Sequence, residues 1–489
     1  MSAYEALKES FHRIACLDEA GAMLSWDASA MMPEGGADAR GEQMAVLAGL
    51  SHEFLCAPEM GEKLTQAHTE AGWDSENLTL MKEAHLRATA LPRDLVEAQV
   101  RAARACETIW RAARRNSDFD AVRDVLAEVV RLTREGAEIL GQALGLSPYD
   151  ALMSQYQRGI SAAEASAIFA RYEAFLCEAL PQAEALQTGR KQVALPPGPY
   201  PEAVQAELAR ALAAGAGLNF NAARLDISTH PFCGGTPTDI RITTRYDEAD
   251  FCAALMGVLH ETGHALYEQN LPAAWRRQPV GAAAGMAMHE SQSLIVEMQA
   301  VRSDAYLSYL APLASSSFGK EITPAALKHR LRRVERSFIR VEADEMTYPA
   351  HVLLRFRLEQ ALLSGGLAVA DLPGAWNEGF KSLLGITPPD DARGCLQDIH
   401  WFDGAIGYFP SYTLGAMAAA QLMEAARKAL PDLDGALAQG DLSPLITWLS
   451  AHVHERGASA GFNEILRAAT GEALNPAYFE AHLTARYLS

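Results

Sequence analysis

The segment DFCAALMGVLHETGHAL, residues 250–266, is the most informative part of the chain. Its apolar residues recur at helical spacing, and Asp250 is a residue type that caps helix N-termini, so the segment predicts an amphipathic helix. His260 and His264 are four positions apart and therefore lie one turn apart on the same face. Two histidines at this spacing can bind a zinc-type ion, and Glu261 beside the first is suited to act as a base. The segment indicates a metal-dependent hydrolase.

A third metal ligand is expected after His264, because catalytic zinc usually takes three protein ligands and leaves one position to water. Glu290 follows at a distance that allows a turn and a return helix. We favour Glu290, since its polar neighbours suit a hydrated site. Glu297, seven positions further on the same helical face, and Glu268, four positions after His264, remain alternatives.

Composition predicts a mainly α fold. Of 489 residues, 49% are hydrophobic and 21% charged, as in soluble globular proteins. Ala, Leu, Glu and Arg are abundant, and runs of β-branched residues are scarce. Short alternating runs at 224–229 and 239–244 predict a small hairpin immediately before the metal-binding helix. An edge strand there can pair with an extended peptide, although a purely structural hairpin fits the pattern equally well.

The clearest linker is KQVALPPGPYP, residues 191–201, with four prolines in eleven residues. Before it, residues 1 to about 190 have the pattern of successive helices, with a loop around 31–36 between the first two. We therefore expect a helical N-terminal subdomain over 1–200 that forms one wall or lid of a cleft. A catalytic helical subdomain over 201–489 would complete one continuous structural unit.

The net charge of −19 argues against a nucleic-acid surface, which needs a basic patch. One basic run, 328–340, alternates with apolar residues at heptad-like spacing and predicts an amphipathic helix with a charged face. The uncharged stretch 404–423 is long enough to span a bilayer. Because it contains Pro410 and several polar residues, it is interpreted as buried core, and no membrane partner is expected.

Cysteine usage favours a cytoplasmic protein. The seven cysteines have no paired spacing, as expected for reduced thiols. The first residues carry charges and lack the apolar region of a signal peptide.

Six short motifs follow one another in order along about 170 residues. They are His230-Pro231-Phe232, Asp239-x-Arg241-x-Thr243, His260-Glu261-x-x-His264, His289-Glu290-Ser291-Gln292, Ile339-Arg340-x-x-Ala343-Asp344 and Gly394-x-x-Gln397-Asp398-x-His400-Trp401. In this ordered set the chain resembles the carboxypeptidase Taq family of metal-dependent carboxypeptidases. The resemblance implies a helical metallopeptidase fold with a deep cleft, removal of single C-terminal residues from peptides of broad sequence, and a homodimer.

The resemblance also implies roles at the metal. His260, His264 and Glu290 would hold zinc, with cobalt or manganese able to substitute, because nitrogen and oxygen ligands do not dictate the metal. Glu261 would be the general base, taking a proton from water and passing it to the leaving amine.

The late segment 400–412 supplies candidates for contacts with the reacting peptide. His400, Tyr408 and Tyr412 are the residue types that related gluzincins place over the metal. Tyr412 is favoured for stabilising the oxyanion and Tyr408 for binding the substrate backbone, although either could be a core aromatic residue. His230 could contact the substrate or the metal-associated water, or could be an ordinary loop residue.

A carboxypeptidase must also bind a free α-carboxylate, for which a planar guanidinium is well suited. Arg340 and Arg241 are the candidates. Arg340 is preferred, because the predicted charged helix would place Asp344 one turn further on, where it would orient Arg340. Gln397 and Asp398 are expected to orient the histidine ligands.

Two other functions remain open. One is an oligopeptidase or dipeptidyl carboxypeptidase on a related helical fold. The other is a metal-binding scaffold without catalysis, against which the intact Glu261 argues.

Overall fold

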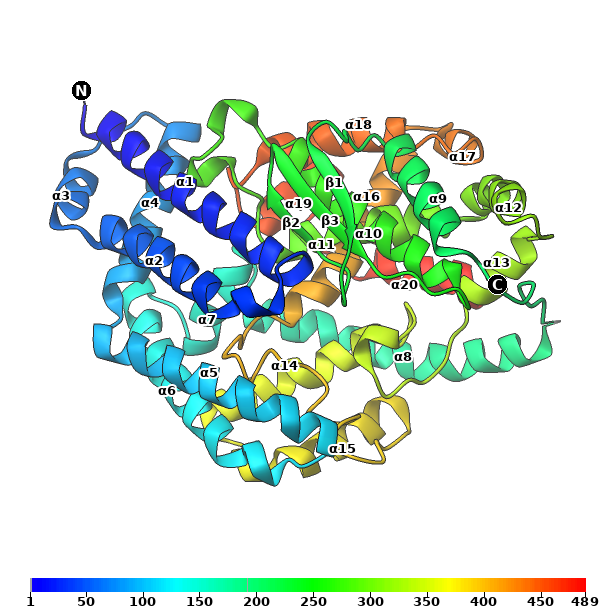
Figure 1. Cartoon of the computed structure of the whole chain (residues 1–489), viewed down its shortest axis with the longest axis horizontal. Helices are drawn as coiled ribbons and strands as arrows, with labels where there is room; N and C mark the ends of the chain where they lie inside the picture. The colour runs from blue at the N-terminus through cyan, green and yellow to red at the C-terminus, as the bar shows by residue number, and fades with distance from the viewer. Residues whose placement is uncertain (1, 191) are drawn as a thin grey trace. The chain divides into compact units, whose positions relative to one another are not determined.

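The computed structural model describes residues 2–190 and 192–489, which are mostly helical with one small sheet (Figure 1). The prediction of a mainly α fold is confirmed. None of the helices in these residues is long and apolar enough to cross a membrane.

The chain folds into two compact units. The first consists of Met1–Ala88, Lys191–Arg332 and Gly415–Leu474, and the second of Thr89–Arg190, Arg333–Leu414 and Asn475–Ser489. This grouping does not follow the expected division at residue 200, because helices far apart in sequence pack into the same core. Among the described residues, the second unit includes the chain from Thr89 up to Arg190, and the expected linker follows directly. That residues 1–200 form a wall or lid stays a prediction.

The first unit contains the helix that carries His260 and His264. Its helices are α1 (Ala3–Ala30), α2 (Ala37–Cys56), α3 (Pro58–Gln66), α4 (Trp73–Ala90, which runs on into the second unit), α9 (Glu202–Gly215), α10 (Phe251–Gln269), α11 (Met286–Leu294), α12 (Asp304–Phe318), α13 (Pro324–Leu331), α16 (Pro410–Ala429, which begins in the second unit), α17 (Leu433–Leu437), α18 (Ser443–His452) and α19 (Phe462–Thr470). A π-helical turn, η4 (Ile295–Val301), continues α11. Short 3₁₀ turns are η1 (Glu34–Gly36), η2 (Ala273–Trp275), η3 (Pro279–Gly281) and η7 (His454–Arg456).

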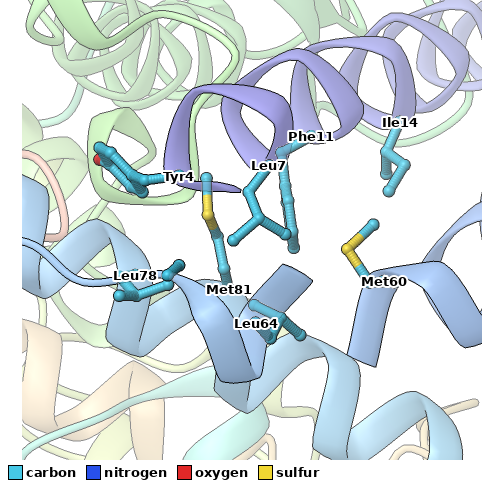
Figure 2. Packing of buried hydrophobic residues seen from close by; sticks show 9 residues of the cluster. Tyr4, Leu7, Phe11, Ile14, Met60, Leu64, Leu78 and Met81 are labelled. Atoms are coloured by element: carbon cyan, nitrogen blue, oxygen red, sulfur yellow. The ribbon is translucent and has the colours of Figure 1, made fainter. Parts of the chain in front are cut away.

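The N-terminal helices of this unit pack through an apolar stripe. Tyr4, Leu7, Phe11 and Ile14 recur at helical spacing and are all buried in α1. Figure 2 shows them facing Met60 and other apolar side chains of α3 and α4. The stripe anchors α1, and the expected loop at 31–36 then separates it from α2.

The small sheet differs from the expected hairpin. Its strands are β1 (Ala223–Ile227), β2 (Cys233–Thr236) and β3 (Asp239–Thr244), in the order β1-β3-β2. The two predicted strands, β1 and β3, pair in parallel, and the antiparallel partner of β3 is β2. The prediction that 224–229 and 239–244 form a hairpin is therefore wrong. The glycine-rich segment assigned to the turn forms β2, which makes the tight turn with β3.

The second unit is made of long paired helices. Its elements are α5 (Arg93–Asn116), α6 (Asp120–Leu144), α7 (Pro148–Tyr156), α8 (Ala162–Gly189), the 3₁₀ turns η5 (Arg340–Glu342) and η6 (Val369–Asp371), α14 (Tyr348–Ser364), α15 (Leu372–Leu384) and α20 (Ala477–Tyr487). Helices α5 and α6 lie side by side, joined by a short turn in which Ser117 adopts a left-handed backbone (Figure 1).

The predicted amphipathic helix over the basic run is also wrong. Helix α13 ends at Leu331, and Arg340 lies in the turn η5. The arginines between these points bond to different elements: Arg332 donates to the carbonyl of Arg302, and Arg336 pairs with Glu184 of α8. Arg333 pairs with the nearby Glu335, so the distant contacts of Arg332 and Arg336 are the ones that hold the segment in an irregular course.

Candidate active site

Helix α10 presents the two motif histidines on one face. Asp250 caps the helix, because its Oδ1 accepts a hydrogen bond from the backbone N–H of Cys252 at 3.0 Å, as expected. The rings of His260 and His264 lie one turn apart, with centroids 5.0 Å from each other.

Glu290 of α11 completes a group of three possible metal ligands. Its Oε2 lies 3.8 Å from Nε2 of His260 and 3.5 Å from Nε2 of His264. The ligand atoms of the three residues all lie within 4.8 Å of one another. Two imidazoles and one carboxylate are the ligand set of many catalytic zinc sites, so the residues present fit a divalent metal.

Glu297, the first alternative ligand, contacts the other side of His260. Its Oε2 lies 3.0 Å from Nδ1 of His260, and Arg302 pairs with its second oxygen. Glu297 belongs to the π-helical turn η4, a type of irregularity that often occurs at functional sites. It therefore supports His260 from behind, as outer carboxylates support histidine ligands in metal sites.

Glu268, the second alternative, contacts His289 instead of the ligand group. Its Oε1 lies 2.8 Å from Nε2 of His289. The other ring nitrogen of His289, Nδ1, lies 2.6 Å from Nδ1 of His264. His264 is thus connected through His289 to a carboxylate on its own helix.

Glu261 is buried at the edge of this group, with 6% of its surface exposed. Burial raises its pKa to about 7, with Glu290 and Glu297 adding to the increase and His260 opposing it. A carboxylate with such a pKa is well placed to exchange protons near neutral pH.

The carboxylates give the group a strong preference for a cation. Burial alone would lower the pKa of His260, but Glu290, Glu297 and Glu261 outweigh it and raise the pKa to about 10. Burial lowers the pKa of His264 to about 4, so its imidazole is neutral and available as a ligand. The same carboxylates that favour a proton on His260 would also stabilise a bound cation.

The candidates His230 and Arg241 lie at the small sheet of the same unit. The side chain of His230 is exposed, and its carbonyl accepts from the Ser228 hydroxyl. Arg241 on β3 pairs with Asp239 at 2.6 Å and lies over the ring of Trp26, 4.8 Å from its centroid. Arg241 therefore has local partners in this structure.

Arg340, in the second unit, is held differently from what the sequence suggested. Its guanidinium pairs with Asp398 at 2.9 Å and donates to the hydroxyl of Tyr348 at 2.8 Å. Asp344 does not orient it, because the Asp344 carboxylate accepts from Thr347 and from the backbone of Glu335 and Met346. That prediction is wrong, and its basis was the helix that does not form.

The expected role of Gln397 and Asp398 is corrected in the same way. Gln397 accepts from the backbone N–H of Arg340 at 2.8 Å. Asp398 lies between Arg340 and Arg355, and these two cations lower its pKa despite burial. The motif containing these residues therefore positions Arg340 rather than a histidine ligand.

The late segment brings His400, Tyr408 and Tyr412 together. Nε2 of His400 lies 3.3 Å from the hydroxyl of Tyr412, and the rings of Tyr408 and Tyr412 meet edge to face with centroids 5.2 Å apart. Burial lowers the pKa of His400 to about 4, so it is a neutral hydrogen-bonding group. Arg340 lies over the ring of Tyr412, 4.8 Å from its centroid.

Sequence reasoning missed several residues that hold these groups. Arg302, Arg355 and Tyr348 lie outside the six motifs, and nothing in their spacing marks them. Glu359 of α14 accepts from Tyr149, from the Trp401 indole and from the Gly407 N–H, and so fixes the segment before Tyr408. The available sequence signal for Glu359 was a glutamate within a run of mostly apolar residues.

A helical fold with two histidines, a glutamate and an adjacent buried glutamate defines a metal-dependent hydrolase. The family model described as carboxypeptidase Taq (M32) metallopeptidase matches residues 6–487. The chain therefore belongs to this family and is a metal-dependent carboxypeptidase.

Individual carboxypeptidases are similar to this chain over nearly its full length. Thermostable carboxypeptidase 1 of Thermus thermophilus is 36% identical, over 99% of this chain and 98% of that protein. Carboxypeptidase 1 of Bacillus subtilis is 33% identical, over 97% and 96%. Among solved structures, metallocarboxypeptidase 1 of Trypanosoma cruzi has a TM-score of 0.97 at 36% identity and covers 100% of this chain and 99% of its own.

Proposed function

We propose that the protein removes single C-terminal amino acids from peptides of broad sequence, using His260, His264 and Glu290 to hold a zinc ion. The convergence of these three side chains, with Glu261 beside them, carries the proposal. Cobalt or manganese is able to replace zinc in such a ligand set. When bound, the metal polarises the scissile carbonyl and makes water a better nucleophile.

Glu261 is the proposed general base. Its carboxylate takes a proton from the attacking water and delivers it to the nitrogen of the leaving amino acid. The pKa of about 7 that burial gives this group suits both transfers. Glu297 and Arg302 keep His260 oriented while the charge of the reacting atoms changes.

Arg340 is the proposed partner of the substrate α-carboxylate, with Arg241 as the second candidate. Asp398 and Tyr348 hold the Arg340 guanidinium, so its orientation is set before a peptide binds. Tyr412 is proposed to donate to the developing oxyanion and Tyr408 to bind the peptide backbone. His400 would orient Tyr412, and His230 would contact the substrate.

The test uses one short peptide with either a free or an amidated C-terminus, incubated with zinc- or cobalt-loaded protein and followed by mass spectrometry. Stepwise loss of single residues from the free form alone is expected. Internal cleavage of both forms would favour an oligopeptidase, and release of dipeptides a dipeptidyl carboxypeptidase. Absence of cleavage with either metal would favour a non-catalytic metal-binding scaffold.

A homodimer in the cytoplasm is also proposed. The seven cysteines, all free thiols in this structure, support a reducing compartment. Sedimentation analysis at micromolar concentration tests the dimer, and a monomer would contradict it.

A further inference from the structure

The two histidines of the proposed metal site have different partners at Nδ1, the ring nitrogen that does not face Glu290. His260 contacts a carboxylate directly, because Glu297 lies at its Nδ1. His264 contacts a second imidazole, that of His289, which in turn contacts Glu268. The mechanism proposed above uses neither His289 nor Glu268.

The hydrogen bonds of this second chain set the direction of each proton. The Glu268 carboxylate only accepts, so Nε2 of His289 donates to it across 2.8 Å. Nδ1 of a neutral His289 is then an acceptor, and His264 must donate its Nδ1–H across the 2.6 Å contact. This leaves Nε2 of His264, which lies 3.5 Å from Glu290, with a free lone pair on the ligand side.

We infer that His289 and Glu268 are positioning residues that fix the tautomer and ring orientation of His264 as a metal ligand. They act through His264 and need no contact with substrate. Outer partners of histidine ligands typically change metal affinity about 10- to 100-fold. The inference rests on the proposed metal site and adds to it a two-residue support for one of its ligands.

Glu268, which contacts His289, is partly exposed to solvent, whereas Glu297, which contacts His260, is buried. The side chain of Glu268 is 25% exposed, whereas that of Glu297 is 9% exposed and paired with Arg302. Glu268 also lines a cavity of about 420 Å³ together with Phe11, Leu271 and Pro272. Glu268 can therefore be replaced without leaving a charge unpaired in a closed core, which makes it the better position for a test.

The experiment measures the zinc affinity of metal-free protein by competition with a chelating dye, for His289→Phe, Glu268→Leu, Glu268→Gln and the double variant His289→Phe/Glu268→Leu. His289→Phe is expected to weaken binding about 10- to 100-fold. Glu268→Leu should weaken it less, and Glu268→Gln should restore most of the affinity because its amide oxygen still accepts from His289. The double variant should bind as His289→Phe does, since both changes break one chain of contacts.

His452→Phe is the matched control. Nδ1 of His452 hydrogen-bonds to the backbone carbonyl of Trp448, and its ring stacks on the Trp448 indole. Replacing His452 therefore removes one imidazole without changing a residue of the proposed metal site. Thermal unfolding of each metal-free variant separates loss of support from loss of fold. The visible spectrum of the cobalt form reports whether the ligand geometry has changed.

Equal zinc affinity of wild type and His289→Phe overturns the inference. So does unchanged affinity of Glu268→Leu together with a large loss in His289→Phe, because His289 would then act without its carboxylate. If wild type itself fails to bind zinc, the proposed metal site is wrong as well. Wild type that binds and cleaves, with variants that bind equally well, refutes only the support of His264.

Discussion

Gly263 lies against the backbone of Gln292, with no room for a side chain between them. A Cβ atom added at Gly263 would be 2.3 Å from the carbonyl oxygen of Gln292 and 2.6 Å from Cα of Ser293. Helices α10 and α11 therefore approach each other backbone to backbone beside the proposed metal ligands. This contact sets the distance between His264 and Glu290, which lie next to it on the two helices.

Gly263→Ala is expected to destabilise the protein by roughly 1–3 kcal/mol and to weaken zinc binding, because the helices must separate. Gly257→Ala on the same helix is the control, since a Cβ there meets Pro231 at 3.7 Å, an ordinary contact. Alanine should even favour the helix at that position. Thermal unfolding and zinc titration of both variants measure this, and equal behaviour of the two would contradict it.

Gly415→Ala should act on Glu290, the third proposed metal ligand. A Cβ at this position of α16 would be 2.7 Å from Cβ of Glu290 and 2.9 Å from the carbonyl oxygen of Ala287. Glu290 must then shift, so zinc affinity is expected to fall about tenfold or more. Gly374→Ala, where a Cβ meets nothing within 4 Å, should bind zinc as wild type does. Normal zinc affinity in Gly415→Ala would mean that α16 moves instead of Glu290.

Glu261→Gln is expected to separate metal binding from catalysis. The amide has nearly the shape of the carboxylate but cannot take a proton, so kcat should fall about 10²- to 10⁴-fold. Zinc affinity should change little, because Glu261 is outside the group of three ligands. Equilibrium dialysis and peptide hydrolysis on the same sample measure both quantities. Retained activity would exclude Glu261 as the base.

Arginine-to-lysine substitutions distinguish the two candidate carboxylate partners. Arg340→Lys keeps the charge beside Asp398 but loses the planar fork, so KM for a free peptide should rise about 10- to 100-fold. Arg241→Lys should have a small effect, because Arg241 pairs with Asp239 beside it on the sheet. Steady-state kinetics of both variants provide the measurement. A larger effect at Arg241 would reverse the assignment.

The helix α10 was predictable, and so was the position of the two proposed ligands on it, because one helix turn places His260 and His264 on the same face. The rest of the site depends on contacts between elements far apart in sequence. The choice among Glu290, Glu297 and Glu268 needed the positions of α11 and η4, since all three carboxylates lie near a histidine ring. Each of the three contacts an imidazole, but among them Glu290 alone belongs to the converging group.

The errors have a common physical origin. The run around Arg330–Arg340 has helical periodicity, yet tertiary ion pairs such as Arg336 with Glu184 override it. Alternation identifies the residues of two strands, but it does not reveal whether those strands pair in parallel. In both cases the local pattern is real, and the partner of the segment depends on contacts that the pattern does not contain.

Glu359 is expected to make the free energy of unfolding depend on pH. Burial raises the pKa of this carboxyl to about 7, although hydrogen bonds from Tyr149, Trp401 and Gly407 oppose the increase. In the unfolded chain its pKa is about 4.3, so between these values the folded state holds a proton that the unfolded state has lost. The stabilising contribution is therefore complete below about pH 4.3 and is lost as the pH rises through about 7.

Glu359→Gln should flatten this dependence between about pH 4.3 and 7, because an amide has no proton to lose in that range. Glu378→Gln, at an exposed position of α15, is the control and should leave the dependence unchanged. Denaturant unfolding at both ends of the range measures the difference in the free energy of unfolding. Identical pH dependence in wild type and Glu359→Gln would show that the Glu359 carboxyl is ionised throughout, and that its three hydrogen-bond donors outweigh the cost of burying its charge.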